Sequence, residues 1–377
     1  MRRLRTHKRP DWTARCEEIG FCYHTTEEGI YWDESGCYEF TSEEIDVLDN
    51  ATAELYHLCL SAVDRVIADN LFPRLAIPVA FAELAKRSWE RRDTTLYGRF
   101  DLCYDGKGKP RLLEFNADTP TSLFESSIVQ WVWLQDLHPS MDQFNSIHEK
   151  LANVFSRVKS VPFSSSIFHF SCVRDNAEDF VTTEYMRDVA AQQGFDTRHI
   201  FIEDIGWSDD ALKFANMQDQ PIDMLFKLYP WEWLIAEEFG KNLLMETVRV
   251  FEPPWKMILS NKGILPILWE MYPGHPNLLP AYFGPGKVDR YVRKPLLSRE
   301  GANVTLYDGL RTETMEGEYG EEGYIYQQYC PIPAFDGNHA VIGSWVINGE
   351  TAGIGVREDT TRITTNTSRF VPHYFAP

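Results

Sequence analysis

Hydrophobic and polar residues alternate with a period of two over residues 99–117, except in the turn-rich segment DGKGKP at the middle. This alternation predicts two β-strands joined by a turn, with polar side chains on one face and apolar side chains on the other. A hairpin that is symmetric about its turn places Asp101 opposite Glu114, and Arg99 opposite Asn116. One sheet face is therefore predicted to carry a cluster of charged and amide side chains.

Three other stretches predict helices. Residues 40–70 form a long amphipathic pattern, with Thr41 or Ser42 as the N-cap and acidic residues in the first turn. A second helix is expected over residues 78–91, and a third over residues 125–158. Neither of the first two helices carries obvious chemistry.

Further along the chain, residues 166–205 predict a strand, a helix and a second strand, the pattern of a right-handed parallel crossover. Residues 221–234 predict a strand that is followed by an aromatic turn, and a helix is expected near residues 235–247. Two prolines in succession, Pro253 and Pro254, mark a boundary.

The composition is that of a globular protein of 377 residues, with 44% hydrophobic and 25% charged residues. A net charge of −19 argues against nucleic acids as partners. The chain has no apolar run of about 18 residues, so no membrane span is expected. Seven scattered cysteines without a CxxC pair favour a reducing cytoplasm. The basic N-terminus MRRLRTHKRPDW lacks the apolar core of a signal peptide, and we expect a flexible solvated arm.

The predicted hairpin has a chemical consequence. Two carboxylates that face each other on one sheet face repel each other unless something positive lies between them. Side-chain oxygens of Asp, Glu and Asn are ligands of hard cations such as Mg²⁺. Asp101, Glu114 and Asn116 are therefore candidate metal ligands, and Arg99 would face the same bound carboxylate or phosphate. The alternative is an exposed hairpin face with ordinary salt bridges.

The second strand leads into the hydroxyl-rich turn NADTPTS, residues 116–122, and then into an apolar segment. Hydroxyls and backbone N–H groups at a helix start form an anion site. Here the chain resembles the synthetase domain of the glutathionylspermidine synthase family and its shorter relatives. The blocks RFD, LLEFNADTPTS and QWVWL carry the resemblance, which extends over nearly the whole chain.

This resemblance implies a mixed α/β fold of the ATP-grasp type with a preceding pre-ATP-grasp substrate domain. We expect residues 1–160 to form a helical region with the metal-site hairpin, and residues 161–252 to form an α/β pre-ATP-grasp subdomain. Residues 253–377 would form the nucleotide-binding part, and the three parts together one catalytic unit. Bifunctional members carry an N-terminal amidase. The synthetase-like residues begin almost at once here, so we expect that amidase to be missing.

Several segments after residue 255 fit ATP binding. Lys262 and Lys294 can converge on a polyphosphate as point charges. The segment SREGANV resembles the glycine-rich lid of ATP-grasp ligases, and residues 299–322 are expected to be poorly ordered without nucleotide. No Walker A motif is present. In the family, the segment that matches YIYQQYCP reads the adenine edge. The expected ATP-binding set is Arg99, Phe100, Asp101, Leu102, Lys262, Lys294, Glu300, Gly301, Gln327, Gln328, Tyr329, Cys330, Arg362, Ile363 and Thr364.

The dipeptide Asn348-Gly349 predicts a type I′ hairpin, whose second strand ends at Arg357. In the family, the counterpart of Arg357 stabilises the transferring phosphate, so Arg357 and Arg99 are the expected catalytic residues. The alternative is a surface ion pair between Arg357 and Glu358 or Asp359.

The resemblance also implies a set of residues that bind the acid substrate. In the family, the region of residues 178 and 179 contributes acidic contacts to the peptide substrate. The alternative is that these two acidic residues only favour the start of a helix. The last block of the chain is expected to touch both nucleotide and acid substrate. The expected acid-substrate set is Arg99, Thr119, Ser122, Glu178, Asp179 and Arg369.

These expectations describe a ligase that uses ATP and Mg²⁺, with two ions, to join a small-molecule carboxylic acid to an amine. The resemblance implies an acyl phosphate intermediate, a glutathione-like or peptide-like acid and a polyamine-like amine. One alternative is a nucleotide-binding protein or ATPase without ligase activity. Another is a metal-dependent hydrolase, which fits the hairpin but leaves the second half of the chain unexplained.

Overall fold

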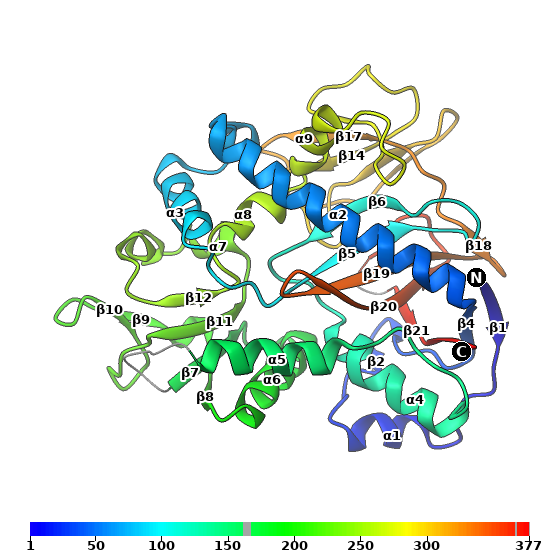
Figure 1. Ribbon diagram of the computed structural model, residues 1–377, viewed down its shortest axis with the longest axis horizontal. Helices are drawn as coiled ribbons and strands as arrows, with labels where there is room; N and C mark the ends of the chain where they lie inside the picture. Colours follow the sequence, from blue (N-terminus) through cyan, green and yellow to red (C-terminus); the bar gives the residue numbers. More distant parts are fainter. Residues whose placement is uncertain (161–166, 366–367, 377) are drawn as a thin grey trace.

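The computed structural model describes residues 1–160, 167–365 and 368–376 as a mixed α/β fold with several sheets (Figure 1). The predicted boundary between the first two parts falls at residues 161–166, outside the described residues. Within the described ranges, an antiparallel sheet at the centre has the strand order β21 (Arg369–Val371), β20 (Glu350–Asp359), β19 (Asn338–Ile347), β5 (Tyr97–Cys103) and β6 (Arg111–Asn116), with β18 (Ala334–Phe335) beside β19.

The predicted hairpin is formed by β5 and β6, and its predicted register is confirmed. Asp101 pairs with Glu114, and Arg99 pairs with Asn116. Leu102 then pairs with Leu112, so a β-bulge leaves Leu113 as the extra residue in β6.

The predicted hairpin around Asn348 and Gly349 is also confirmed as the β19–β20 turn. Their φ angles of +48° and +85° are both left-handed, as a type I′ turn requires.

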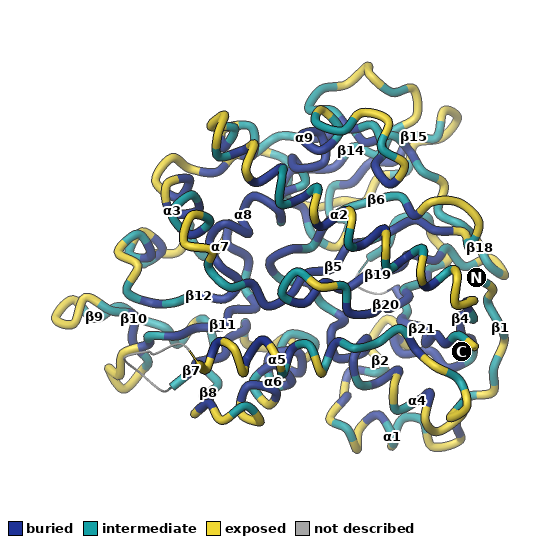
Figure 2. Tube along the Cα trace, viewed as in Figure 1, coloured by how far each residue is buried: buried dark blue, intermediate teal, exposed yellow. Residues whose placement is uncertain are grey.

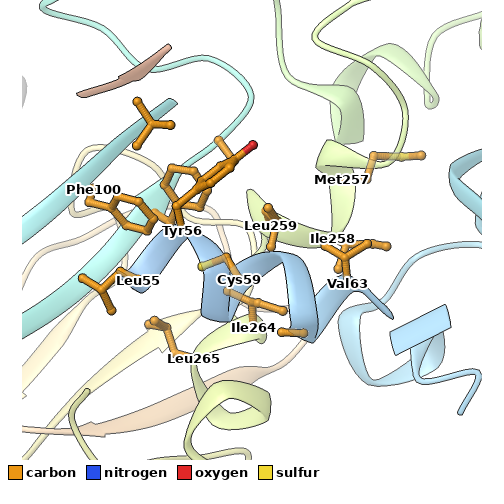
Figure 3. Packing of buried hydrophobic residues seen from close by; sticks show 14 of the residues in the cluster. Leu55, Tyr56, Cys59, Val63, Phe100, Met257, Ile258, Leu259, Ile264 and Leu265 are labelled. Carbon is orange, nitrogen blue, oxygen red and sulfur yellow. The ribbon is translucent and has the colours of Figure 1, made fainter. Parts of the chain in front are cut away.

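The two faces of the central sheet differ, because neighbours along a strand point to opposite faces. One face packs Phe100, Phe115 and Ile342 into a large apolar cluster with helix α2 (Ser42–Ala68), which runs across the sheet (Figure 1). Figure 3 shows Leu55, Tyr56 and Cys59 of this cluster, together with residues of helices α8 (Lys256–Leu259) and α9 (Ile264–Met271). The opposite face carries Asp101, Glu114 and their neighbours.

The predicted first and second helices are confirmed. Helix α2 begins at the predicted N-cap Thr41, whose hydroxyl accepts from the Glu44 backbone while the Glu44 carboxylate accepts in return. Helix α3 (Val79–Glu90) follows a short 3₁₀ turn, η1 (Phe72–Leu75).

The predicted continuous helix over residues 125–158 is wrong. The structure divides it into a π-helical turn, η2 (Glu125–Val129), and the helices α4 (Gln130–Leu137) and α5 (Ile147–Lys159). Helix α4 stops just before Pro139, which cannot continue a helix. Trp131 is 41% exposed and Trp133 is fully buried, so the two side chains do point to different sides of α4.

A separate parallel sheet has the order β12 (Arg249–Phe251), β11 (Met224–Leu228), β7 (Ile167–Cys172) and β8 (Asp196–Phe201). Helix α6 (Ala177–Gln192) joins β7 to β8 and confirms the predicted crossover. The helix expected near residues 235–247 is wrong, since only the short α7 (Trp231–Leu234) and a 3₁₀ segment, η4 (Gly240–Met245), form there. The small elements η3 (Ile202–Asp204), β9 (Gly206–Ser208) and β10 (Lys213–Ala215) complete this part.

The second antiparallel sheet lies beyond α9 (Figure 1) and has the order β13 (Ala281–Tyr282), β17 (Tyr324–Gln328), β14 (Tyr291–Pro295), β15 (Thr305–Tyr307) and β16 (Thr312–Thr314). The prediction that residues 299–322 lack order is wrong for β15 and β16. Strand β15 pairs with β14, and β16 pairs with β15, so both strands belong to this sheet.

The prediction of a flexible, solvated N-terminal arm is wrong. The arm forms strand β1 (Arg2–Arg5). Strand β1 pairs with β4 (Gly36–Phe40), which also pairs with β22 (His373–Phe375) near the C-terminus (Figure 1). Arg3 holds the fully buried Glu358 through two hydrogen bonds of 2.8 and 2.9 Å. Ion pairing with a distant carboxylate thus anchors the arm, which local composition could not show. The remaining N-terminal elements are α1 (Trp12–Glu18), β2 (Thr25–Thr26) and β3 (Gly29–Ile30).

Buried residues predominate in β5, β19 and β20, whereas many exposed residues lie in the outer loops (Figure 2). Both large apolar clusters draw on all three predicted parts; one of them contains Tyr38, Ile200 and Leu265. This sharing fits a single catalytic unit, and the predicted division into parts stays a prediction. Across the described residues, no helix combines the length and apolar character that a membrane crossing needs.

Candidate active site

A cleft lies between the polar face of the central sheet and the second antiparallel sheet, and encloses about 750 Å³ of atom-free space. Both sheets supply its walls. It is lined by Asp101, Leu113, Glu114, Lys262, Val292, Lys294, Gly301, Val304, Leu306, Gln327, Gln328, Tyr329, Cys330, Ile332, Val341, Arg362, Ile363 and Thr364. Eleven of these residues belong to the expected ATP-binding set, although they come from segments that lie far apart in the sequence.

The three predicted metal ligands meet at the floor of the cleft. The Asn116 side-chain amide lies 3.2 Å from Asp101 Oδ2 and 3.3 Å from Glu114 Oε1, so it bridges the two carboxylates. Among the described residues, no group of three or more His, Cys, Asp or Glu side chains is placed to hold a metal ion. The predicted set contains two carboxylates and an amide, and this hard-oxygen donor set fits Mg²⁺ completed by water and phosphate oxygens.

Arg99 is fixed beside these groups by two hydrogen bonds to Asp101, of 2.7 and 3.1 Å, and by one of 2.6 Å to the Thr121 carbonyl. Burial alone would lower the pKa of Arg99, but the charge of Asp101, its hydrogen bonds to Arg99 and the Glu114 charge together raise that pKa. The side chain lies over Gly343, where an added Cβ would stand 2.8 Å from Arg99 Cδ. A residue without a side chain on β19 therefore makes room for the guanidinium.

Lys262 and Lys294 approach the same carboxylate from the second half of the chain. Lys262 Nζ lies 3.2 Å from Glu114 Oε2, and Lys294 donates to the Leu113 carbonyl at 2.8 Å and to Gln327 at 2.9 Å. Burial opposes ionisation of Glu114, yet the two lysine charges lower its pKa to about 2. Burial lowers the pKa of Lys294 to about 8, against the attraction of Glu114. The two cations predicted to converge on a polyphosphate do converge.

The apolar part of the cleft was missed by the sequence analysis. Val292 lies two residues before Lys294 on β14, and strand alternation could have placed both side chains on one face. Leu306, Ile332 and Val341 line the same wall, but no local pattern in the sequence marks them.

Four members of the expected ATP-binding set do not line the cleft: Arg99 lies beside its floor, and the other three lie elsewhere. Phe100 and Leu102 are fully buried in the apolar cluster beneath the sheet, because they alternate with Arg99 and Asp101 and so point to the other face. The side chains of Phe100 and Leu102 therefore face away from the cleft. Glu300 is exposed and does not line the cleft.

Arg357 lies on the polar face of the central sheet. It pairs with Val341 of β19, and Gly343, two residues further along β19, pairs with Asp101. Arg357 donates to the Thr365 carbonyl. Its neighbour Glu358 is directed to the opposite face, so the alternative of an Arg357–Glu358 surface ion pair does not hold.

In the acidic pair at the start of α6, Glu178 is close enough to Arg357 for their charges to interact, and Asp179 lies near Arg299 instead. Burial raises the pKa of Glu178, and the Arg357 charge opposes that rise. Burial, with the Glu178 charge next, raises the pKa of Asp179 to about 7. Glu178 therefore borders the same region as the catalytic candidate Arg357.

The other acid-substrate candidates separate into two groups. Thr119 accepts a hydrogen bond of 2.6 Å from Arg299, a residue missed by the sequence analysis, which also pairs with Glu232 at 2.7 Å. Arg369 lies beside Glu358 and pairs with it at 3.2 Å, on the face away from Arg357. Strand alternation thus separates Arg369 from Arg357, and its contact with the acid substrate stays a prediction.

Ser122 belongs to a buried polar cluster beside the site. Its Oγ lies 3.1 Å from the Tyr31 hydroxyl, which donates to Glu125 Oε1 at 2.6 Å. Burial and the Glu178 charge raise the pKa of the fully buried Glu125 to about 7. The sequence analysis missed Glu125, since a single carboxylate ahead of an apolar helix gives no signal.

Two antiparallel sheets enclose a cleft with carboxylates and cations at its floor, which is the arrangement expected of an ATP-grasp fold. A solved structure supports this class: a glutathione synthetase-like effector from Globodera pallida matches with a TM-score of 0.57 and 10% identity, over 97% of this chain and 94% of that one. The family model described as glutathionylspermidine synthase preATP-grasp matches residues 3–376. The chain therefore belongs to the glutathionylspermidine synthase family.

Two curated relatives show how far the likeness extends. A Haemophilus influenzae protein named "Putative acid–amine ligase" is 42% identical, over 98% of each chain. The bifunctional glutathionylspermidine synthetase/amidase of Escherichia coli is 28% identical over 89% of this chain and 58% of that protein. The chain thus spans nearly all of the first relative and little more than half of the second.

Proposed function

We propose that this protein is an ATP- and Mg²⁺-dependent ligase that joins a carboxylic acid to an amine through an acyl phosphate. The observation that carries the proposal is the gathering of Arg99, Lys262 and Lys294 around the Asp101–Glu114 carboxylate pair at the floor of the cleft. The names of its relatives, which include an acid–amine ligase and a glutathionylspermidine synthetase, support the same reaction class.

Each group has a task in this proposal. Bound Mg²⁺, proposed as two ions, would neutralise phosphate charge next to Asp101, Glu114 and Asn116. Lys262 and Lys294 hold the polyphosphate as point charges. Phosphoryl transfer depends mainly on positioning and on charge neutralisation, and these residues supply both.

The acid substrate would be fixed by planar guanidinium groups. Arg99 presents its fork toward the floor of the cleft, and Arg357 approaches from β20 on the same sheet face. Arg357 would stabilise the charge that develops on the transferred phosphoryl group. The hydroxyl-bearing turn at residues 119–122, held through Arg299 and Tyr31, would contact the acid.

The substrates that we propose are a peptide-like acid such as glutathione and a polyamine-like amine, in line with the relatives' names. A net charge of −19 favours a cationic amine over an anionic one. All seven cysteines are free thiols, which supports a reducing cytoplasmic location.

Substitution of Arg357 tests the proposal. Arg357→Ala should lower kcat for ATP consumption by roughly a hundredfold, the usual cost of losing one electrostatic stabiliser of a transition state. ATP affinity should change much less, because Lys262 and Lys294 remain. Arg357→Lys should restore little activity, since an ammonium cannot reproduce a planar fork.

The assay is ATP consumption with a panel of acids and amines, with the products identified by mass spectrometry. Arg198→Ala, which removes an exposed arginine from the distant strand β8, is the matched control and should keep full turnover. An unchanged kcat in Arg357→Ala would remove this residue from the site. ATP consumption that yields no amide with any pair in the panel would contradict a ligase.

A further inference from the structure

Two cysteines that are far apart in sequence meet beside the proposed nucleotide cleft. Cys103 Sγ and Cys330 Sγ lie 3.2 Å apart, and Cys103 also lies 3.4 Å from the Pro331 carbonyl. Cys103 ends β5 and is 6% exposed, whereas Cys330 is more open and lines the cleft. No other pair of cysteine sulfurs in the described chain is recorded within hydrogen-bond distance.

The position of this pair links the two sheets of the site. Cys330 belongs to the segment between β17 and β18, which crosses from the second sheet to the central sheet. Cys103 lies at the end of the strand that also carries Arg99 and Asp101. A covalent bond between the two sulfurs would therefore tie the crossing segment to the floor strand of the cleft.

We propose that Cys103 and Cys330 form a modification site, at which a low-molecular-weight disulfide oxidises the pair to an intramolecular disulfide that weakens nucleotide binding. This inference rests on the proposed function, because the regulated event is the binding of ATP in the cleft. In this proposal, the ratio of small disulfides to small thiols in the surroundings controls ATP binding in the cleft.

The chemistry balances with a small disulfide as the only oxidant. The Cys330 thiolate attacks one sulfur of the reagent, forms a mixed disulfide and releases one small thiol. Cys103 then attacks Cys330 Sγ and displaces the second small thiol. The two protein thiols lose two electrons and two protons, and the reagent disulfide is reduced to two thiols.

Access and acidity both favour Cys330 as the first sulfur to react. It borders the open cleft, while Cys103 is buried behind it. Hydrogen bonding with Cys103 lowers the pKa of Cys330, against the effect of burial. A thiolate is the reactive form, so the cleft-facing sulfur is the one that captures the reagent.

The disulfide should change the cleft because the sulfurs must approach from 3.2 Å to about 2 Å. Closure of that gap pulls the crossing segment toward β5, and Tyr329 and Ile332 of this segment line the cleft. Nucleotide binding and disulfide formation are then coupled. By linkage, the disulfide weakens nucleotide binding by the same factor by which bound nucleotide opposes oxidation.

The test uses bis(2-hydroxyethyl) disulfide, since glutathione is a proposed substrate and would confuse the result. Full-length protein is equilibrated in buffers of this disulfide and its thiol, with and without a non-hydrolysable ATP analogue and Mg²⁺. Peptide mapping should find a Cys103–Cys330 disulfide that lacks the two thiol hydrogens. Calorimetry should show affinity for the analogue reduced by about tenfold or more in the oxidised protein.

Three variants sharpen this test. Cys103→Ser should trap the reagent as a mixed disulfide on Cys330, and Cys330→Ser should form no adduct on buried Cys103. Cys22→Ser, which removes an exposed and distant thiol, is the matched control and should behave as wild type.

The outcomes separate the two proposals. Absence of the Cys103–Cys330 disulfide under excess reagent, or equal analogue affinity in oxidised and reduced protein, overturns the inference and leaves the ligase proposal standing. Failure of reduced wild-type protein to bind the analogue overturns the proposed function, and the inference with it.

Discussion

Replacement of Glu125 by glutamine should stabilise the protein, and more strongly at pH 8 than at pH 5. Glu125 is fully buried, and its raised pKa of about 7 compares with an ordinary value of 4.5. At about 1.4 kcal/mol per pKa unit, ionisation of this carboxyl inside the fold costs on the order of 3 kcal/mol above pH 7. Glutamine keeps the shape and can still accept the Tyr31 hydroxyl hydrogen bond, but carries no charge.

The sign follows from the two pKa values. The folded-state pKa of Glu125 lies above its unfolded value, so the folded state favours the protonated carboxyl. The stabilising contribution of that carboxyl is therefore fully present below pH 4.5 and is lost as the pH rises through about 7. The variant removes this loss. It also relieves Glu178 of a like charge, which acts in the same direction.

The assay is urea denaturation of wild type and Glu125→Gln at pH 5 and pH 8, with the free energies of unfolding compared. The gain at pH 8 should exceed the gain at pH 5 by about 2 kcal/mol or more. Glu83→Gln, on the exposed side of α3, is the matched control, because an exposed carboxyl loses little hydration on folding. Equal changes at both pH values in Glu125→Gln would refute the reasoning.

Three further predictions concern the metal, the arm and the sheet face. Calorimetry in excess EDTA should show ATP affinity at least about tenfold weaker than with Mg²⁺, and equal affinity would contradict the metal site. Arg3→Ala should cost about 3 kcal/mol in urea denaturation, since it removes a partner of the buried Glu358, while Arg5→Ala, at an exposed position, should cost little. Gly343→Ala should lower turnover by about tenfold or more, because the new Cβ displaces Arg99, and thermal unfolding should confirm that the variant is folded.

Much of the candidate site could be predicted from local sequence. Period-two alternation and the turn between the strands were enough for the register that sets Asp101 against Glu114. The Asn348-Gly349 dipeptide specified its own hairpin, because few residues adopt two successive left-handed conformations. In each case the determining interactions lie within one hairpin, so the information is local.

Other features were beyond local reasoning. The long helix expected over residues 125–158 failed at the segment before α5, and the N-terminal arm that looked solvated is held by Glu358 from the far end of the chain. Arg369 shows the same difficulty on a smaller scale. The resemblance implied a role for it at the acid substrate, but its strand position and its hydrogen bond to Glu358 depend on the pairing of β20 with β21.

The sequence by itself thus determined the hairpins, the capped helix α2 and the residue types at the floor of the cleft. Only the tertiary structure decided that Lys262 and Lys294 meet Glu114, that Val341 and Ile332 form an apolar wall, and that two distant cysteines touch. The physical reason is the range of the interactions. Strand alternation and turn conformation act over a few residues, whereas the order of strands in a sheet depends on which distant segments bury their apolar faces together.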